Sequence, residues 1–169
     1  MILTAFTVFH VILSLVGIGS GFVVVFGLLG SKRLEGWTKL FLSTTVATSV
    51  TGFFFPFHGF TPAIGVGIVS LLVLAVAILA LYRFGLAGGW SRTYAISVVV
   101  SQYLNFFVLI VQLFRRVPVL RELAPTQSEP PFQIAQLAVL LLFLGLGIRA
   151  AMKFHGEPSL MTRARIAKA

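Results

Sequence analysis

The sequence predicts an all-α integral membrane protein, folded as a compact bundle of five transmembrane helices. Apolar residues make up 58% of the 169 residues and charged residues only 10%, a balance typical of membrane proteins. Residues 64–81 carry no ionisable side chain, and a helix crosses the hydrocarbon core with roughly 20 apolar residues. Charges gather in short basic segments between the apolar tracts. Because five helices and their connections use nearly the whole chain, we expect no separate soluble domain.

The predicted spans are bounded by basic, glycine or proline residues. Lys32 and Arg33 follow the first span, and Pro56 ends the second because proline has no amide hydrogen and clashes with the preceding turn. Pro62 suits the first turn of the third span. The spans lie at residues 2–29, 37–55, 61–81, 91–114 and 132–151, within a transmembrane domain of residues 1–152 that precedes a basic cytoplasmic tail at 153–169.

The longest connection, residues 115–130, contains the segment APTQSEPP and is expected to be irregular. Ser128 or Glu129 is a candidate cap for the last helix, with Pro130 and Pro131 in its first turn.

The distribution of lysine and arginine predicts the topology. Arg115, Arg116 and Arg121 lie on one side of the five spans, and the other ten of the 13 basic residues lie on the opposite side. By the positive-inside rule, the amino terminus faces outward and the carboxyl-terminal tail is cytoplasmic, in a multi-pass protein of a bacterial inner membrane. Three interfacial aromatic residues agree with this orientation: Trp37, Tyr82 and Trp90. The ten cytoplasmic bases are Lys32, Arg33, Lys39, Arg83, Arg92, Arg149, Lys153, Arg163, Arg165 and Lys168.

A duplicated hairpin is one interpretation of the first four spans. Residues 36–39 (GWTK) align with residues 89–92 (GWSR), and the same offset aligns residues 53–54 with residues 106–107, all four of which are phenylalanine. The bundle would then contain two parallel hairpin repeats plus a fifth helix. The alternative is that apolar helices with tryptophan at the membrane interface resemble one another by composition alone.

Missing residue types and motifs exclude several kinds of chemistry. The chain has no cysteine, which excludes thiolate catalysis, iron–sulfur clusters and covalently attached haem. It has no aspartate, and its four glutamates lie in predicted loops or tails, so proton- or sodium-coupled transport is disfavoured. The sequence contains no HExxH, GxSxG or Walker motif, and we expect no enzymatic activity. The net charge of +9 serves topology and contacts with anionic lipid, with no role for nucleic acid.

Small residues on the predicted helices indicate close helix packing. Gly17 and Gly21 form a GxxxG pair in the first span, and such pairs let helix backbones approach one another in lipid. Two uses are open: packing within one chain, or an interface in a homo-oligomer or with another membrane-complex subunit. Further small residues recur at Thr44, Thr48 and Gly52 and at Ala63 and Gly67.

Polar residues suggest a site in the outward-facing half of the bundle. The fourth span carries a polar stripe on one helical face, comprising Tyr94, Ser97, Ser101, Asn105 and Gln112. Unpaired amides are costly in hydrocarbon, so Asn105 and Gln112 should point into the bundle. The imposed orientation brings His10 and His58 to the outer half of the bundle, with Gln112, Gln133 and Gln136 at similar depths. The phenylalanines of residues 53–60 surround His58.

The leading functional hypothesis is therefore an outward-facing polar pocket that binds or passes a small molecule through His10, His58, Asn105, Gln112 and Gln136. No cofactor is predicted on this hypothesis. A second hypothesis is a redox protein or subunit that holds haem b between His10 and His58, which would then be the metal ligands. A third is a structural or assembly subunit without a ligand, using Gly17 and Gly21 as its interface.

Overall fold

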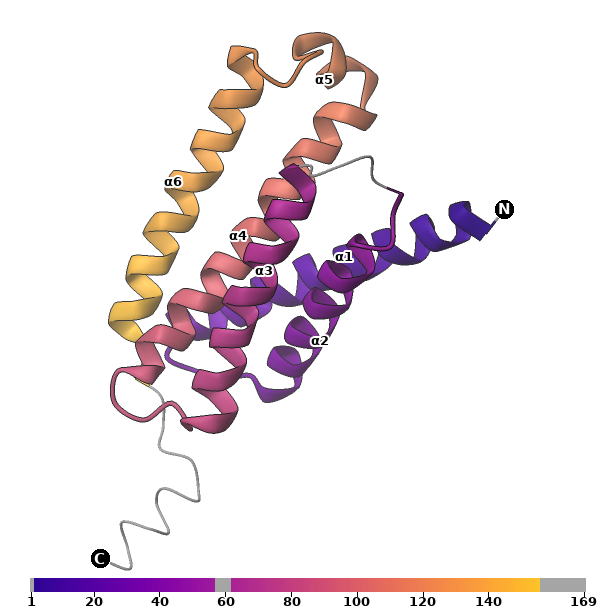
Figure 1. The fold of residues 1–169 in the computed structure, drawn as a ribbon. Coiled ribbons are helices and arrows are strands. Elements are labelled where there is room, and N and C mark those ends of the chain that lie inside the picture. Colours follow the sequence, from indigo (N-terminus) through magenta and orange to yellow (C-terminus); the bar gives the residue numbers. More distant parts are fainter. Residues whose placement is uncertain (1, 57–61, 156–169) are drawn as a thin grey trace, which may run out of the picture.

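The computed structural model describes residues 2–56 and 62–155. Helices account for 84% of these residues, and the described part of the chain contains no strand, so the all-α prediction is confirmed there. Figure 1 shows a bundle of helices, with α4 and α6 side by side. The elements are α1 (Ile2–Leu29), α2 (Glu35–Gly52), α3 (Pro62–Ile78) with its π-helical continuation η1 (Leu79–Arg83), α4 (Trp90–Arg116), α5 (Pro118–Leu123) and α6 (Pro130–Lys153).

Four of the helical segments are long and apolar enough to cross a membrane: Thr4–Leu29, Pro62–Arg83, Trp90–Arg116 and Pro130–Lys153. The predicted span at 37–55 does form a helix, α2, but this helix is not among the four, so five crossings are not confirmed. The reason is composition: α2 begins with Glu35, includes Lys39 and is rich in threonine. Its 18 residues extend about 27 Å, slightly less than the hydrocarbon thickness.

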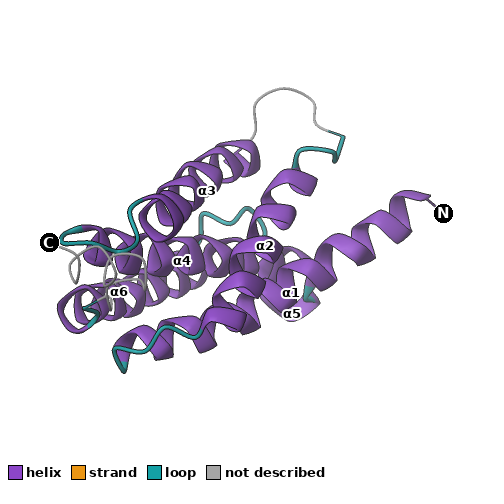
Figure 2. Ribbon diagram, turned by 90° about the horizontal axis from the view of Figure 1, so that it is seen from below, coloured by secondary structure: helices purple, strands orange, loops and turns teal. Residues whose placement is uncertain are grey.

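Helix α2 returns antiparallel along α1 in spite of its polarity. Near the start of α1, His10 contacts Thr51; further along, the backbone at Gly17 approaches Thr45, and Gly21 lies against Phe41. One end of the bundle therefore holds the start of α1, the end of α2, the start of α3, the end of α4 and the start of α6. Figure 2, which views the bundle from below, shows α1 running beside α2 and obliquely to the other helices.

The buried core lies in the half of the bundle away from that end. Side chains with almost no exposure meet there from all the long helices, and each comes from the half of its helix nearer Lys32, Arg83 and Arg92. Examples are Val25 and Leu28 of α1, Phe41 of α2, Leu74 and Ala77 of α3, Val98 of α4 and Ala150 of α6. Large apolar side chains on the outer surface of the bundle stay exposed, as in helices that face lipid.

Gly21 lies in a close contact of α1 with α4 and α2. A Cβ atom built on Gly21 would lie 2.0 Å from Gln102 Oε1 and 2.8 Å from Phe41 Cε2, so a side chain there would force these neighbours to shift. A Cβ atom on Gly17 would lie 3.3 Å from Thr45 Oγ1. Both glycines of the GxxxG pair thus pack within the chain, and the face predicted as an alternative partner interface is covered by α2 and α4.

Several predicted boundaries need correction. The connection at 115–130 is not fully irregular, because α5 forms at Pro118–Leu123 with proline at its first turn and good helix formers behind it. Helix α2 ends at Gly52, before Pro56, since residues before proline disfavour helical geometry. Lys153 ends α6 rather than beginning the tail. The remaining tail, residues 156–169, lies outside the described residues.

Two further predictions concern local structure. Pro62 begins α3, and Pro130 begins α6 with Glu129 in the capping position, as predicted. The Glu129 side chain makes no cap bond to the helix; its carboxylate instead accepts hydrogen bonds from Thr126 and from the Ser128 amide. The hairpin duplication stays a prediction. Of the two aligned glycines, Gly36 lies inside α2, whereas Gly89 precedes α4.

Candidate functional site

A cavity of about 670 Å³ lies between α1, α2, α3 and α4, at the end of the bundle opposite the core. This volume falls within the range of small-molecule pockets. The cavity is bordered on α1 by residues 7–18, on α2 and its end by residues 48–55, on α3 by residues 63–70 and on α4 by residues 104–116. Most of its lining side chains are apolar, including Val11, Leu15, Ile18, Leu104, Val108 and Leu109.

The cavity exists because α1 leaves α4 beyond their crossing point at Gly21. Figure 1 shows the amino-terminal half of α1 running away from the carboxyl-terminal half of α4. At the wall formed by α2 and α3, the Phe53 ring packs closely against the backbone of Gly67 of α3. A Cβ atom on Gly67 would lie 2.9 Å from that ring. Exposed side chains of Val11 and Leu15 on α1 and of Val108 on α4 border the cavity, so it opens between these two helices.

His10 lines the cavity from α1 and is held in place by α2. Its Nδ1 lies 2.9 Å from Thr51 Oγ1, and that hydroxyl in turn donates to the Ala47 carbonyl oxygen at 2.7 Å. Because the hydroxyl hydrogen is used there, His10 Nδ1 is the donor to Thr51, and Nε2 is left as an acceptor. Among the described residues, Nε2 has no hydrogen-bond partner. The Phe55 ring packs edge-on against the imidazole, with the centroids 5.1 Å apart.

The two predicted amides of α4 also line the cavity, in different environments. Asn105 is half-buried, and its Nδ2 lies 3.4 Å from Thr45 Oγ1, a long hydrogen bond. Gln112 lies one turn before the end of α4 and is exposed, so it borders the mouth rather than pointing into the bundle core. His10, Asn105 and Gln112 are thus brought to one cavity.

The remaining two predicted site residues are not part of this cavity as described. Gln136 lies between α6 and α4, where its Nε2 donates to the Phe107 carbonyl oxygen at 3.2 Å. It does not line the cavity, because α6 packs on the other side of α4. His58 lies outside the described residues, so the two-histidine haem hypothesis stays a prediction. Within residues 2–56 and 62–155, no three His, Cys, Asp or Glu side chains gather as a candidate metal site.

Several cavity residues were not among the predicted site residues. Ser14, Ser49 and Ser70 line the walls, and Ser14 donates to the His10 carbonyl oxygen, so its hydroxyl is satisfied by its own helix. Thr48 also lines the cavity, and its buried hydroxyl has no partner among the described residues. Small hydroxyl residues at helical spacing predict packing, which explains why sequence analysis did not single them out. Arg115 and Arg116 lie at the mouth.

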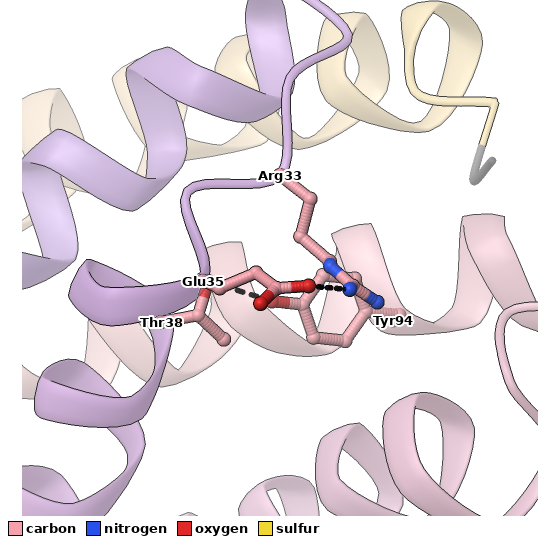
Figure 3. Close-up of polar contacts among 4 residues, drawn as sticks. All are labelled: Arg33, Glu35, Thr38 and Tyr94. Atoms are coloured by element: carbon pink, nitrogen blue, oxygen red, sulfur yellow. Dashed lines mark hydrogen bonds and ion pairs between the residues drawn. The ribbon is translucent and has the colours of Figure 1, made fainter. Parts of the chain in front are cut away.

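The other half of the polar stripe on α4 is structural. Tyr94 is fully buried, and its hydroxyl lies 3.4 Å from Thr38 Oγ1 of α2. Figure 3 shows this pair beside Arg33 and Glu35, which form an ion pair. Further along α4, the fully buried Gln102 donates from Nε2 to the Ile18 carbonyl oxygen at 2.8 Å. These contacts join α4 to α1 and α2 and leave no room for a ligand.

Searches of protein-family models, curated proteins and solved structures found no match to this chain.

Proposed function

We propose that this protein is a multi-pass protein of a bacterial inner membrane whose cavity between α1 and α4 binds or passes a small molecule. The observation that carries the proposal is the cavity itself: about 670 Å³, with largely apolar walls and a few polar groups from separate helices. His10, Asn105 and Gln112 supply polar groups from two walls, and the apolar walls supply most of the contact surface. No catalytic role is assigned to any of these residues.

The proposed orientation puts the cavity on the non-cytosolic side. It requires α2 to cross the membrane, which its antiparallel contacts with α1 support even though its composition is polar. Two threonines of α2, Thr44 and Thr51, are compatible with lipid because their hydroxyls donate to carbonyls of their own helix, as Thr44 does to Leu40 at 2.7 Å. The bases at the core end then face the cytoplasm, and the amino terminus faces outward.

The proposal is tested by filling the cavity and measuring what the purified protein retains. Val108 lines the cavity, whereas Ile96 lies three turns earlier on α4, is similarly exposed and does not line it. Val108→Trp and Ile96→Trp are therefore a matched pair. The proteins would be extracted with native lipid, and their bound small molecules identified by mass spectrometry.

We expect a molecule that copurifies with the unmodified protein and with Ile96→Trp and is depleted from Val108→Trp. An identical set of bound molecules in all three proteins would contradict the proposal.

A further inference from the structure

Two arginines at the mouth of the cavity have no acidic partner. Arg115 and Arg116 occupy the last turn of α4, both are exposed and both line the cavity. Among the described residues, the ion pair between Arg33 and Glu35 is the only one. The acidic residue just before α6, Glu129, is already engaged by Thr126 and Ser128. Both guanidinium groups are thus available to an external anion.

The cavity below these arginines is apolar along the length of α4. From Arg115 down to Leu104, the helical rise gives roughly 16 Å, about the length of an extended chain of 12 to 14 carbons. Along this path, Leu104, Val108 and Leu109 of α4 line the cavity together with Leu15 and Ile18 of α1. Of the polar groups in the cavity, Ser14 bonds within α1 and Asn105 bonds Thr45, whereas His10 Nε2 and the Thr48 hydroxyl have no partner among the described residues.

A ligand that matches both features has an anionic head and one apolar chain. Arginine binds carboxylates through paired, charge-assisted hydrogen bonds, and apolar walls favour an alkyl chain over a polar solute. The opening between α1 and α4 lies along helix faces whose other side chains are exposed and apolar, so such a ligand can enter from the bilayer without crossing water.

We propose that the cavity binds a long-chain fatty acid, with its carboxylate at Arg115 and Arg116 and its alkyl chain between α1 and α4. This inference depends on the proposed function, because it names the ligand class for the same cavity. The polar groups at the mouth, Gln112 and the two arginines, then surround the head group, and His10 lines the wall beside the chain.

The test uses the full-length protein in nanodiscs of zwitterionic phosphatidylcholine and a palmitic acid analogue with a photoreactive diazirine in mid-chain. After irradiation, labelled residues are mapped by mass spectrometry. We expect labelling within residues 7–18 and 104–113. Unlabelled palmitic acid should compete for these sites, whereas cetyl alcohol, which has the same chain without the charge, should compete about tenfold less well.

Matched arginine variants identify the head-group site. Arg115→Gln with Arg116→Gln should weaken labelling of the cavity about tenfold, because charge-assisted bonds to the carboxylate are lost. Arg121→Gln, on the same side but outside the cavity, should change it by less than about twofold, as should Arg83→Gln with Arg92→Gln at the opposite end. All these residues are exposed, so the variants should fold.

Two results would overturn the inference and leave the proposed function intact. The first is equal competition by cetyl alcohol and palmitic acid, which would indicate a neutral apolar ligand. The second is labelling of the cavity that the Arg115 and Arg116 variants do not weaken. Absence of labelling at residues 7–18 and 104–113 would also overturn it, whereas the proposed function is contradicted separately, by the bound molecules of the Val108→Trp protein.

Discussion

The two halves of the bundle use the polar residues of α4 in opposite ways. In the half that contains the core, Tyr94 and Gln102 are fully buried and bond to α2 and α1. In the other half, Asn105 and Gln112 border a cavity. The difference comes from α1, which touches α4 at Gly21 and diverges from it beyond that point. A polar stripe on a membrane helix thus becomes a packing contact or a site according to how close its neighbour lies.

The largest loss of stability is expected at Gly21, where the packed half of the bundle meets the cavity half. Gly21→Val should lower the free energy of unfolding by about 1–3 kcal/mol, because its side chain would collide with Gln102 and Phe41. Gly19→Val is the matched control on the same helix, since nothing lies within 4 Å of a Cβ atom at that position. Steric trapping in bilayers would measure both values. Equal effects of the two substitutions would show that α1 and α4 are not in close contact.

Removal of one amide side chain from the packed half and one from the cavity half should lower the free energy of unfolding by different amounts. Gln102→Ala should cost about 1–2 kcal/mol of unfolding free energy, through loss of its bond to Ile18 and of buried packing. Asn105→Ala should cost about 0.6 kcal/mol or less, because its hydrogen bond is long and it borders open space. The same unfolding measurement applies. A larger loss for Asn105 than for Gln102 would reverse the assignment of the two halves.

A smaller effect is expected at the wall of the cavity. Thr51→Val removes the acceptor of the His10 bond and should lower unfolding free energy by about 0.6 kcal/mol. Thr93→Val is the control, because the Thr93 hydroxyl bonds only to a carbonyl of its own helix. If the two variants unfold alike, the contact between His10 and Thr51 contributes nothing.

The smallest effect on stability is expected in the connection before α6, at residues 126–129. Desolvation raises the pKa of Glu129, but hydrogen bonds from the Thr126 hydroxyl and from the Thr126 and Ser128 amides outweigh it, and the pKa lies below its ordinary value. A carboxyl with a lowered folded-state pKa stabilises the fold above its unfolded pKa, and this contribution is lost as the pH falls through the folded value.

Thermal unfolding measured from neutral to acidic pH should therefore show a slight acid-dependent loss in the unmodified protein that Glu129→Gln lacks. Glu122→Gln, in α5, is the control and should retain the loss. An unchanged pH profile in Glu129→Gln would contradict the role of this carboxylate.

The helices could be predicted from the sequence because they depend on local composition. The helix starts at Pro62 and Pro130 follow from proline chemistry, and the grouping of His10, Asn105 and Gln112 follows from antiparallel connectivity. The burial of Gln102 was not predicted, because it depends on the angle at which α1 crosses α4, which no single helix encodes.

The position of Gln136 outside the cavity was not predicted for a related reason. Its depth along α6 is readable from the sequence, but the face that α6 presents to α4 is set by packing with residues such as Phe143 and Val99. Helix α2 falls short as a membrane span because Glu35, Lys39 and its threonines lower its hydropathy, although it packs along α1.

The central claim is that one half of the bundle is tightly packed and the other holds a cavity. Its most direct test compares two serines of α1. Ser14 lines the cavity, whereas Ser20 is buried in the packed half, and each donates to the carbonyl four residues before it. Because the chain contains no cysteine, Ser14→Cys and Ser20→Cys each introduce a single thiol. In sealed vesicles, a membrane-impermeant thiol reagent on the non-cytosolic side should label Ser14→Cys rapidly and Ser20→Cys only after unfolding. Equal labelling of both, or labelling of Ser14→Cys from the cytosolic side alone, would contradict the account.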